Sequence, residues 1–374
     1  MRNATSRRST RLSLLLIASL LLTGCAQKNI LEDLGLITAA AYDLAEDKKL
    51  KVTVTMPETS QEATEKVQVI TAKGALFKEA TSNISLATDR QVVSGQMRTA
   101  IFSEKLARVG LWRAVDTLLR DVNITSSLIL CISDGDAREV LATKYPEHQR
   151  VGKYIFELLS KEAKTFSIPK TTLYGFAREY NSSGTDPVIP YIRLTGEHLL
   201  AAGTALFRDD RFVGSLSPEE TKMFLMLKGS GKGADLKQTL HNLGGDEGAA
   251  QVLLTYVLSK QSHEASIQDG KPQIVFDIKL FGQVIEYTGT QSISKKDVLE
   301  KIEREVEKGL KKRMEDLIQQ LQRKYKCDPI GIGDHLRAKG LYKRWNHDIW
   351  REAYAQTKIK VNLKLDIIRT GIIK

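Results

Sequence analysis

The stretch of sequence that decides the fold is Lys358-Ile359-Lys360-Val361-Asn362-Leu363-Lys364-Leu365-Asp366-Ile367. Apolar and polar side chains alternate over all ten residues, and successive side chains of a β-strand point to opposite faces of its sheet. The pattern predicts a strand with one face in an apolar core. The other face is mostly lysine and is expected to lie in water.

A long helix is expected before this strand. Its apolar stripe consists of Val298, Ile302, Val306, Leu310, Met314, Leu317 and Leu321. We expect the helix to begin at the capping-box-like Ser294-x-x-Asp297 and to run to about residue 325, roughly 45 Å. Strand patterns at 249–262 and 272–288 flank Asp269-Gly270, a strong hairpin signal. The C-terminal part is therefore predicted to be an antiparallel sheet packed against a long helix, and the fold class α+β.

The N-terminal half alternates strand and helix patterns. Strands are expected at 52–56, 67–69, 100–102 and 128–132, and helices at 76–84, 103–120, 136–143 and 151–164. The run 128–132 is continuously apolar, which is typical of a strand buried on both faces. The clearest loop is 181–187, where we place a domain boundary.

The middle of the chain contains a predicted hairpin. Its strands are Ala202–Phe207 and Phe212–Leu216, joined by a turn at 208–210. Ser217-Pro218 then opens a helix, with serine as the cap and proline at the first helical position. The glycine-rich segments 228–235 and 244–248 are expected to be flexible.

Composition and charge exclude several classes of protein. The 374 residues are 42% hydrophobic and 27% charged, unlike a disordered chain or a multi-pass membrane protein. Three cysteines exclude a disulfide-stapled scaffold. The net charge of +11 is uneven, because residues 1–24 hold four arginines and no acid, and 295–374 hold 21 Lys or Arg against 12 Asp or Glu.

Residues 1–24 have the pattern of an export signal peptide. The four arginines precede an apolar run of 11 residues, 12–22. A bilayer-spanning helix needs about 20 apolar residues, so this run is too short to be a stable span. The pair Arg7-Arg8 does not make a twin-arginine signal, because polar Thr10 stands where an apolar residue is needed.

The signal ends in Leu22-Thr23-Gly24-Cys25, the lipobox pattern of an aliphatic residue, two small residues and a cysteine. The small residues fit the narrow site of the peptidase, and the Cys25 sulfur is the nucleophile that takes a diacylglyceryl group. Two acyl chains meet the requirement for stable anchoring. We predict that Cys25 is lipidated and that the mature protein, 25–374, is tethered outside the cytoplasmic membrane. The alternative is an ordinary signal peptide with an incidental cysteine.

The sequence contains no spacing typical of a catalytic or metal site. Its six histidines include no His-x3-His or His-Glu-x-x-His pair. The segment 229–233 resembles a phosphate-binding loop, but Met226 and Gly233 occupy the positions of the required Gly and Ser or Thr. Asp209-Asp210 lies in the predicted hairpin turn, where solvated aspartates serve the backbone. We therefore expect no catalytic residue, no metal and no cofactor.

Two other features allow alternative interpretations. Cys131 and Cys327 can form a disulfide outside the cytoplasm, but Cys131 lies in an apolar strand, where a free thiol behaves as a small hydrophobe. Trp345 and Trp350 stand among basic residues, a pattern found in nucleic-acid binding. An exported protein should meet no nucleic acid, so packing in the core is favoured. The basic C-terminal part can also lie on anionic lipid, although a solvated face is the simpler interpretation.

Several blocks of the sequence resemble the Ger(x)C family of spore germination lipoproteins, over essentially the whole chain. The blocks are 32–39, Arg120-Asp121, 203–214, 325–334, Trp345 with Trp350, and 369–371. The resemblance implies three mixed α/β domains, which we place at 25–185, 186–245 and 246–374. Only Cys25 is carried over as a site residue.

The resemblance also implies a function. It indicates a non-enzymatic C subunit of a nutrient germinant receptor, acting beside membrane-embedded A and B subunits at the outer face of the spore inner membrane. Two other classes remain. A lipid-anchored solute-binding protein of a transporter needs two similar α/β lobes, and a lipid-anchored cell-envelope hydrolase needs a nucleophile or metal motif.

Overall fold

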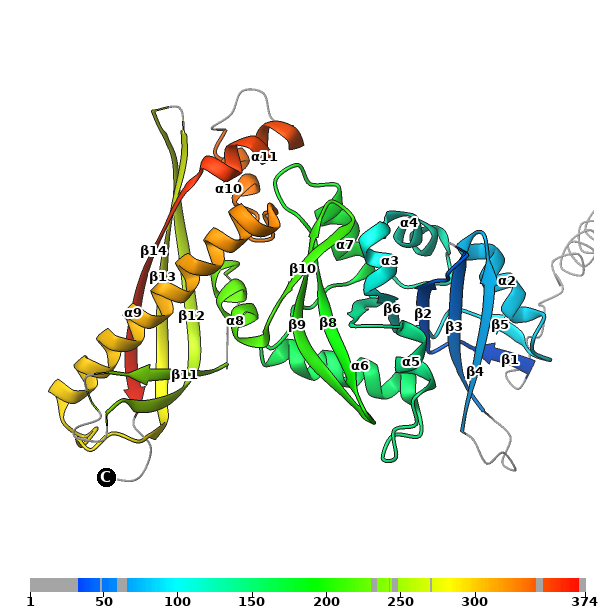
Figure 1. The fold of residues 1–374 in the computed structure, drawn as a ribbon, viewed down its shortest axis with the longest axis horizontal. Coiled ribbons are helices and arrows are strands. Elements are labelled where there is room, and N and C mark those ends of the chain that lie inside the picture. The colour runs from blue at the N-terminus through cyan, green and yellow to red at the C-terminus, as the bar shows by residue number, and fades with distance from the viewer. Residues whose placement is uncertain are drawn as a thin grey trace, which may run out of the picture. The chain divides into compact units, whose positions relative to one another are not determined.

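The computed structural model describes residues 33–47, 49–58, 66–229, 234–241, 243, 248–269, 271–340 and 346–369, and those from Gly35 onward form one compact unit. The strands make an eight-stranded sheet, a four-stranded sheet and a pair of short strands, β1 (Leu34–Leu36) and β5 (Gln91–Val93) (Figure 1). Among the described helices, none has both the length and the apolar character needed to span a bilayer.

The eight-stranded sheet has a parallel centre and antiparallel edges. Its strands are β2 (Ala39–Leu44), β3 (Leu50–Pro57), β4 (Val67–Gly74), β6 (Thr99–Ser103), β7 (Ile129–Ser133), β8 (Val188–Thr195), β9 (His198–Arg208) and β10 (Arg211–Leu216). The spatial order is β10-β9-β8-β7-β6-β2-β3-β4. The four neighbours β8, β7, β6 and β2 run parallel, and β3–β4 and β9–β10 are added as antiparallel strands at the two edges.

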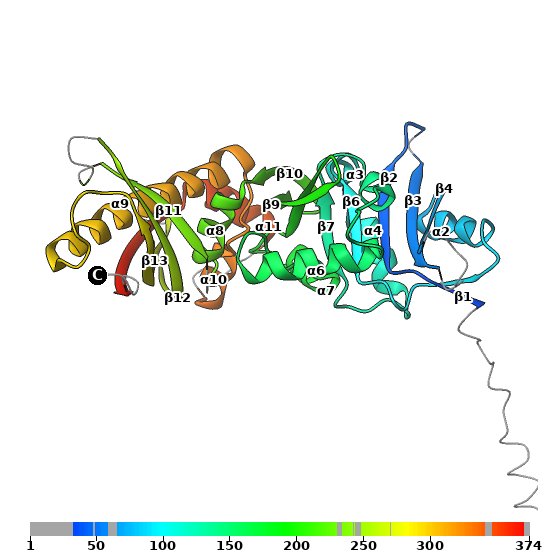
Figure 2. The same ribbon diagram turned by 90° about the horizontal axis from the view of Figure 1, so that it is seen from below.

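Helices cover both faces of this sheet, as a parallel centre requires. One face is covered by α2 (Phe77–Ser85), α3 (Glu104–Val109), α4 (Trp112–Arg120) and α7 (Leu173–Tyr180). The other is covered by α5 (Ala137–Ala142) and α6 (Val151–Lys164), and Figure 2 shows α6 from below. The apolar strand β7 sends Leu130 into the first core and Cys131 into the second, which confirms burial on both faces.

The four-stranded sheet is covered by helices on one face. Its order is β11 (Asp235–Leu240), β12 (Ala250–Gln268), β13 (Lys271–Tyr287) and β14 (Lys358–Arg369). The long helix α9 (Lys296–Gln320), continued by the π-helical turn η3 (Leu321–Tyr325), lies across it (Figure 1). The shorter helices are α8 (Pro218–Leu227), α10 (Ile332–Ala338) and α11 (His347–Gln356).

The alternation of β14 is confirmed. Val361 and Leu365 are buried in one core with the apolar stripe of α9, whereas Lys360 and Lys364 are exposed. The antiparallel arrangement holds for β11, β12 and β13, but β14 pairs with β13 in parallel. A parallel neighbour needs a long crossover connection, and α9 lies within the segment between these two strands.

Three local predictions are corrected by the structure. The helix expected over 103–120 is two helices, α3 and α4, because the chain turns at Gly110 with φ +132°. Lys295, not Ser294, precedes α9, and the Ser294 hydroxyl instead lies 2.8 Å from that of Ser292. The glycine-rich segment 228–235 was expected to be flexible over its whole length, but its last residue, Asp235, is the first residue of strand β11.

The division into three domains stays a prediction. The loop at 181–187 is present between α7 and β8. However, β8 pairs with β7 in the same sheet, with Ile132 opposite Tyr191, so sheet hydrogen bonding continues across the proposed boundary at 185/186. The helix cap at Ser217 is confirmed, since its hydroxyl accepts from Glu220 N at 3.3 Å.

Candidate functional site

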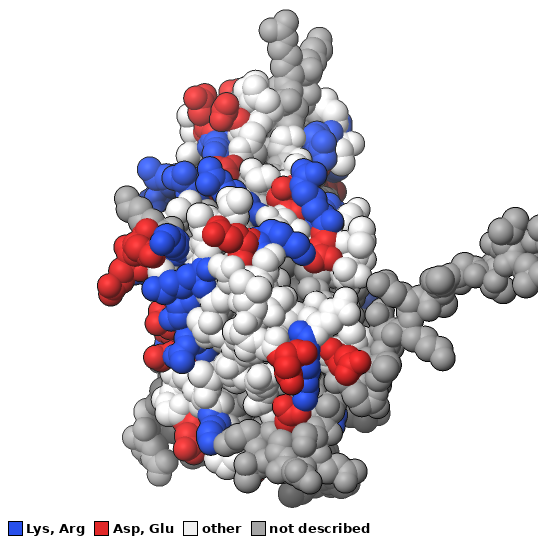
Figure 3. Space-filling view, turned by 90° about the vertical axis from the view of Figure 1, so that its right-hand side faces the viewer, with Lys and Arg blue, Asp and Glu red and all other residues white. Residues whose placement is uncertain are grey.

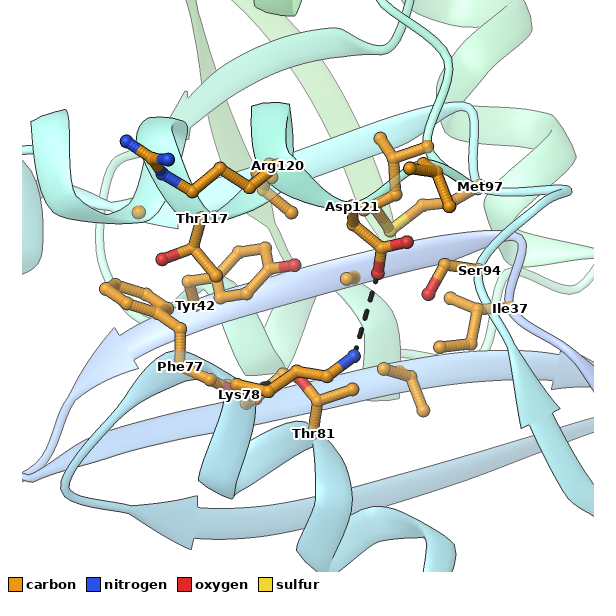
Figure 4. A pocket seen from close by; sticks show the side chains of 17 residues that line it. Ile37, Tyr42, Phe77, Lys78, Thr81, Ser94, Met97, Thr117, Arg120 and Asp121 are labelled. Carbon is orange, nitrogen blue, oxygen red and sulfur yellow. Dashed lines mark hydrogen bonds and ion pairs between the residues drawn. The ribbon is translucent and has the colours of Figure 1, made fainter.

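A cavity of about 370 Å³ lies on the face of the eight-stranded sheet that α2, α3, α4 and α7 cover, between β2, β3, α2 and α4 (Figure 4). Most of its wall is apolar. The apolar lining includes Ile37, Val54, Phe77, Met97, Leu118 and Ile124. The strand residues come from the face that β2 and β3 turn toward α2 and α4, so the same alternation that builds the core also builds the floor of the cavity.

Tyr42 supplies a polar group inside this cavity. Its side chain is 5% exposed, stacks on Phe102 at 5.1 Å between ring centroids and meets the edge of Phe77 at 5.8 Å. The hydroxyl points into the cavity, which Lys78 and Asp121 also line (Figure 4). Burial, and secondly the Asp121 carboxylate, raise the pKa of Tyr42, so the hydroxyl stays protonated and can donate.

Two opposite charges lie at the mouth of the cavity. Lys78 Nζ is 3.8 Å from Asp121 Oδ2, while Asp121 Oδ1 accepts from the backbone N–H of Asn123 at 3.0 Å. The Arg120 guanidinium donates to Asp116 at 2.9 Å. Of the pair Arg120-Asp121, only the aspartate therefore joins Lys78 across the mouth.

The face shown in Figure 3 has an uncharged centre. Lys and Arg lie beside Asp and Glu at its margins. Opposite charges at short range cancel each other's field beyond a few ångströms. This face is therefore unsuited to recognising a polyanion by bulk charge.

A second polar cluster joins the loop before β8 to the C-terminal helices. The Asp186 carboxylate accepts from Asp328 N at 2.7 Å and from Asp209 N at 3.1 Å, and Asp328 O accepts from Asp186 N at 2.9 Å. Arg351 Nη2 lies 2.5 Å from Asp209 Oδ1 and 3.8 Å from Asp186 Oδ1. Three segments that are far apart in sequence are thus fixed to one another.

Asp328 is the most buried acid of this cluster. Its carboxylate accepts from the N–H groups of Gly331 at 3.0 Å and Gly333 at 2.9 Å, and from Trp350 Nε1 at 3.1 Å. Burial raises the pKa of Asp328 to about 7 despite these donors. Burial also raises the pKa of Asp186. The cluster therefore holds the proton of a carboxyl group near neutral pH.

Asp186, Asp209 and His347 bring one ligand atom each to within 4.8 Å of one another. Arg351 already supplies the positive charge between the two carboxylates. The arrangement is therefore explained as an internal ion-pair network. Sequence reasoning missed this cluster because its members come from three segments with no common spacing.

The structure tests some of the predictions that the sequence analysis made for single residues. Cys25 and Trp345 lie outside the described residues, whereas Trp350 is buried as expected. Cys131 and Cys327 are both free and buried. Asp209-Asp210 lies in the predicted turn, both residues are partly exposed, and the expected backbone role is confirmed for Asp210. Asp209 binds Arg351, and Asp210 Oδ2 accepts from Trp112 N at 3.0 Å.

Two family models match the chain. The model described as "Spore germination protein N-terminal domain" matches residues 27–194, and the model described as "Spore germination B3/ GerAC like, C-terminal" matches 202–371. Spore germination protein GerQC of Bacillus cereus is 24% identical over 361 residues, which cover 96% of this chain and 98% of that protein. Spore germination protein B3 of Bacillus subtilis (strain 168) is 24% identical over 378 residues, which cover 98% and 99%.

A solved structure has the same fold. The crystal structure of the GerBC protein superposes with a TM-score of 0.60 at 22% identity, covering 88% of this chain and 96% of that chain. At this identity the likeness concerns the fold. The mixed α/β architecture, with its C-terminal sheet and long helix, is therefore shared.

Proposed function

Because this chain belongs to the Ger(x)C family of spore germination proteins, we propose that it is a non-enzymatic subunit of a receptor through which nutrients trigger spore germination. The observation that carries the proposal is the match to both family domains, at 27–194 and 202–371. A non-catalytic role is supported by the buried aspartates, whose carboxylates are held by backbone N–H groups and Arg351.

The proposed partners are two membrane-embedded subunits, A and B, at the outer face of the spore inner membrane. The proposed tether is a diacylglyceryl group on Cys25, supported by the lipobox directly after the apolar run. Tethering would raise the effective concentration of the folded part beside the membrane subunits. The folded part would then need only modest docking contacts of its own.

Deletion of the gene tests the proposal. Spores should lose germination to one class of nutrient, while growth, sporulation and germination by agents that bypass receptors stay normal. A solute-binding protein of a transporter would instead give an uptake or growth defect on its solute during vegetative life. The unlike sheets, eight-stranded and four-stranded, also differ from the two similar lobes of that class.

The tether is tested separately. Cys25→Ala should move the protein from the membrane to the soluble fraction or leave it unprocessed, and mass spectrometry of the wild-type protein should find the acyl groups on Cys25. An unmodified mature terminus at another residue would refute the lipidation. It would leave the receptor role to be judged by the deletion.

A further inference from the structure

A basic groove of about 530 Å³ lies between the long helix α9 and β11, the edge strand of the four-stranded sheet (Figure 1). The charged side chains that line it are four Lys or Arg and two carboxylates, namely Lys237, Lys308, Lys312, Arg313, Glu305 and Asp316. Positive charge is therefore in excess here, unlike at the margins of the face in Figure 3, where both signs lie side by side.

The groove forms where α9 comes close to β11. A Cβ at Gly309 would lie only 2.4 Å from Gln238 Nε2, so the absence of a side chain at this position allows the close approach. Gln238 Oε1 accepts from Arg313 Nη2 at 3.0 Å and so links strand and helix. Lys308 and Lys312 stand four residues apart on α9, and side chains at this spacing share one face of a helix.

The lysines of the groove lack opposite charges. Among the residues that the structure describes, Lys237, Lys308 and Lys312 form no ion pair. Two lysines one helical turn apart also repel each other. By contrast, Lys311 of the same helix lies outside the groove, and its Nζ is 3.9 Å from Glu315 Oε1. The fold therefore leaves the positive charge of the groove uncompensated.

Arg313 adds a partly buried cation to the groove. Its Nη1 lies 4.0 Å from Glu219 Oε2, but Glu219 also binds Lys222, whose Nζ is 2.7 Å from Oε1. The Nε atom of Arg313 is buried and has no partner within the described part of the chain. Burial lowers the pKa of Arg313, and Glu219 opposes this shift only in part. An added anion in the groove would stabilise this guanidinium in its charged form.

The arrangement of the cations indicates the class of ligand. A phosphate group has several acceptor oxygens and can contact two or three cations at once, and Lys and Arg both bind phosphate. We infer that the groove between α9 and β11 binds a phosphate group, carried by a free phosphate compound or by a lipid headgroup. The oxygens accept from the ammonium groups of Lys237, Lys308 and Lys312, and Arg313 adds positive charge. This inference goes beyond the proposed function, because a subunit that acts only through protein contacts needs no anion site.

Calorimetric titration of the full chain in neutral detergent, at constant ionic strength, tests the ligand class. The probes are inorganic pyrophosphate, glycerophosphoglycerol as the headgroup of phosphatidylglycerol without its acyl chains, and acetate. At least one phosphate probe should bind about tenfold more tightly than acetate, because acetate forms fewer charge-assisted contacts. Whichever phosphate probe binds more tightly identifies the source. If neither binds more tightly than acetate, the inference is overturned.

Variants of the same full chain test the place of binding. Lys308→Gln and Lys312→Gln should each weaken the tighter phosphate probe by about fivefold or more, because each removes one charge-assisted contact. Lys311→Gln is the matched control, since it removes the same charge one residue away but outside the groove, and it should change the affinity by less than about twofold. Equal losses in Lys312→Gln and Lys311→Gln would overturn the site.

Asp316→Asn gives the opposite sign. Asp316 is one of the two carboxylates that line the groove, so its neutralisation should tighten the binding of phosphate by about twofold. A role of these residues in folding alone predicts no change in affinity. Weaker binding in this variant would contradict the proposed excess of positive charge. The germination phenotype of the deletion does not depend on any of these results.

Discussion

The two large sheets of the molecule differ in how helices cover their apolar faces. The eight-stranded sheet has helices on both faces, and its helix layer leaves a cavity between α2 and α4. The four-stranded sheet has its helices on one face, and the stripe of α9 fills the core against Ile278, Val361 and Leu365. The first sheet thus keeps a mainly apolar hollow beneath its helices, whereas the stripe of α9 packs directly on β13 and β14.

The two regions should therefore contribute differently to the stability of the fold. Side chains around the cavity, such as Lys78, are partly exposed and contribute little to folding. Val361 and Leu365, which lie between β14 and α9, are 0% and 1% exposed. Substitutions in the core of the C-terminal sheet should therefore lower the free energy of unfolding strongly, whereas substitutions at the mouth of the cavity should change it little.

The largest effect is expected from Val361→Asp. It buries a charge without a partner in the core between β14 and α9, so the full chain should lose about 4 kcal/mol or more. The neighbouring Lys360→Glu lies on the opposite, exposed face and should change stability by less than about 0.5 kcal/mol. Denaturant unfolding of the full chain compares the two variants. Equal losses would contradict the register of β14.

Asp328→Asn should lower the free energy of unfolding by a smaller amount, about 2–3 kcal/mol. The amide group would turn a donor toward the N–H groups that the carboxylate now accepts from, leaving a buried donor unsatisfied. Thermal unfolding at pH 7, with Asp316→Asn on the outer surface of α9 as the control, measures this loss. A variant as stable as the control would show that these hydrogen bonds contribute nothing.

The same residue gives the stability of the wild type a pH dependence. The pKa of Asp328 is about 7 in the fold against 3.8 ordinarily, so the folded chain binds this proton more tightly than the unfolded chain. Its contribution to stability is complete below about pH 4 and is lost as the pH rises toward 7. Stability curves over this range should fall with pH in the wild type and fall much less in Asp328→Asn. Identical slopes would rule out Asp328 as the titrating group.

A smaller effect is expected from Asp210→Ala. Asp210 accepts from Trp112 N at the start of α4, and its hairpin lies beside Gly110, where an added Cβ would come within 2.7 Å of Asp210 Oδ2. Loss of this cap should cost about 1 kcal/mol. Asp116→Ala removes only an exposed ion pair on the same helix and is the control. The cap has no role if both variants unfold at one midpoint.

The smallest effect on stability is expected from Lys78→Gln. The lysine side chain is 75% exposed, so its ion pair with Asp121 is worth less than about 0.5 kcal/mol. Thermal unfolding of the variant and of the wild type measures the difference, and a large loss of stability would remove the contrast between the two sheets.

The sequence predicts the four-stranded sheet better than the eight-stranded one. The exposed face of β14 appears in the sequence as polar residues, mostly lysine, at every second position, and the buried face of α9 appears as an apolar stripe, because each element has one side in water. The central strands are buried on both faces and give only apolar runs, which predict β6 and β7 but leave β8 without a distinctive pattern. The parallel pairing of β14 could not be predicted, because direction depends on the path of the connection.

The site was only partly predictable for the same reason. Asp121 was singled out within a family block, but Tyr42 and Lys78 belong to β2 and α2, and only the fold brings them together. Likewise Asp186 meets Asp328 across a separation that no local spacing rule covers. Contacts of this kind depend on the tertiary structure and leave no periodic pattern.

The central claim is that a tethered receptor subunit acts in germination. The most direct measurement is the germination rate of deletion-strain spores on a nutrient mixture after complementation with the wild type or with Cys25→Ala. We predict full restoration by the wild type and partial restoration by Cys25→Ala, because docking contacts remain when the tether is lost. Deletion spores that germinate normally on every nutrient, with no other family member expressed, would contradict the account.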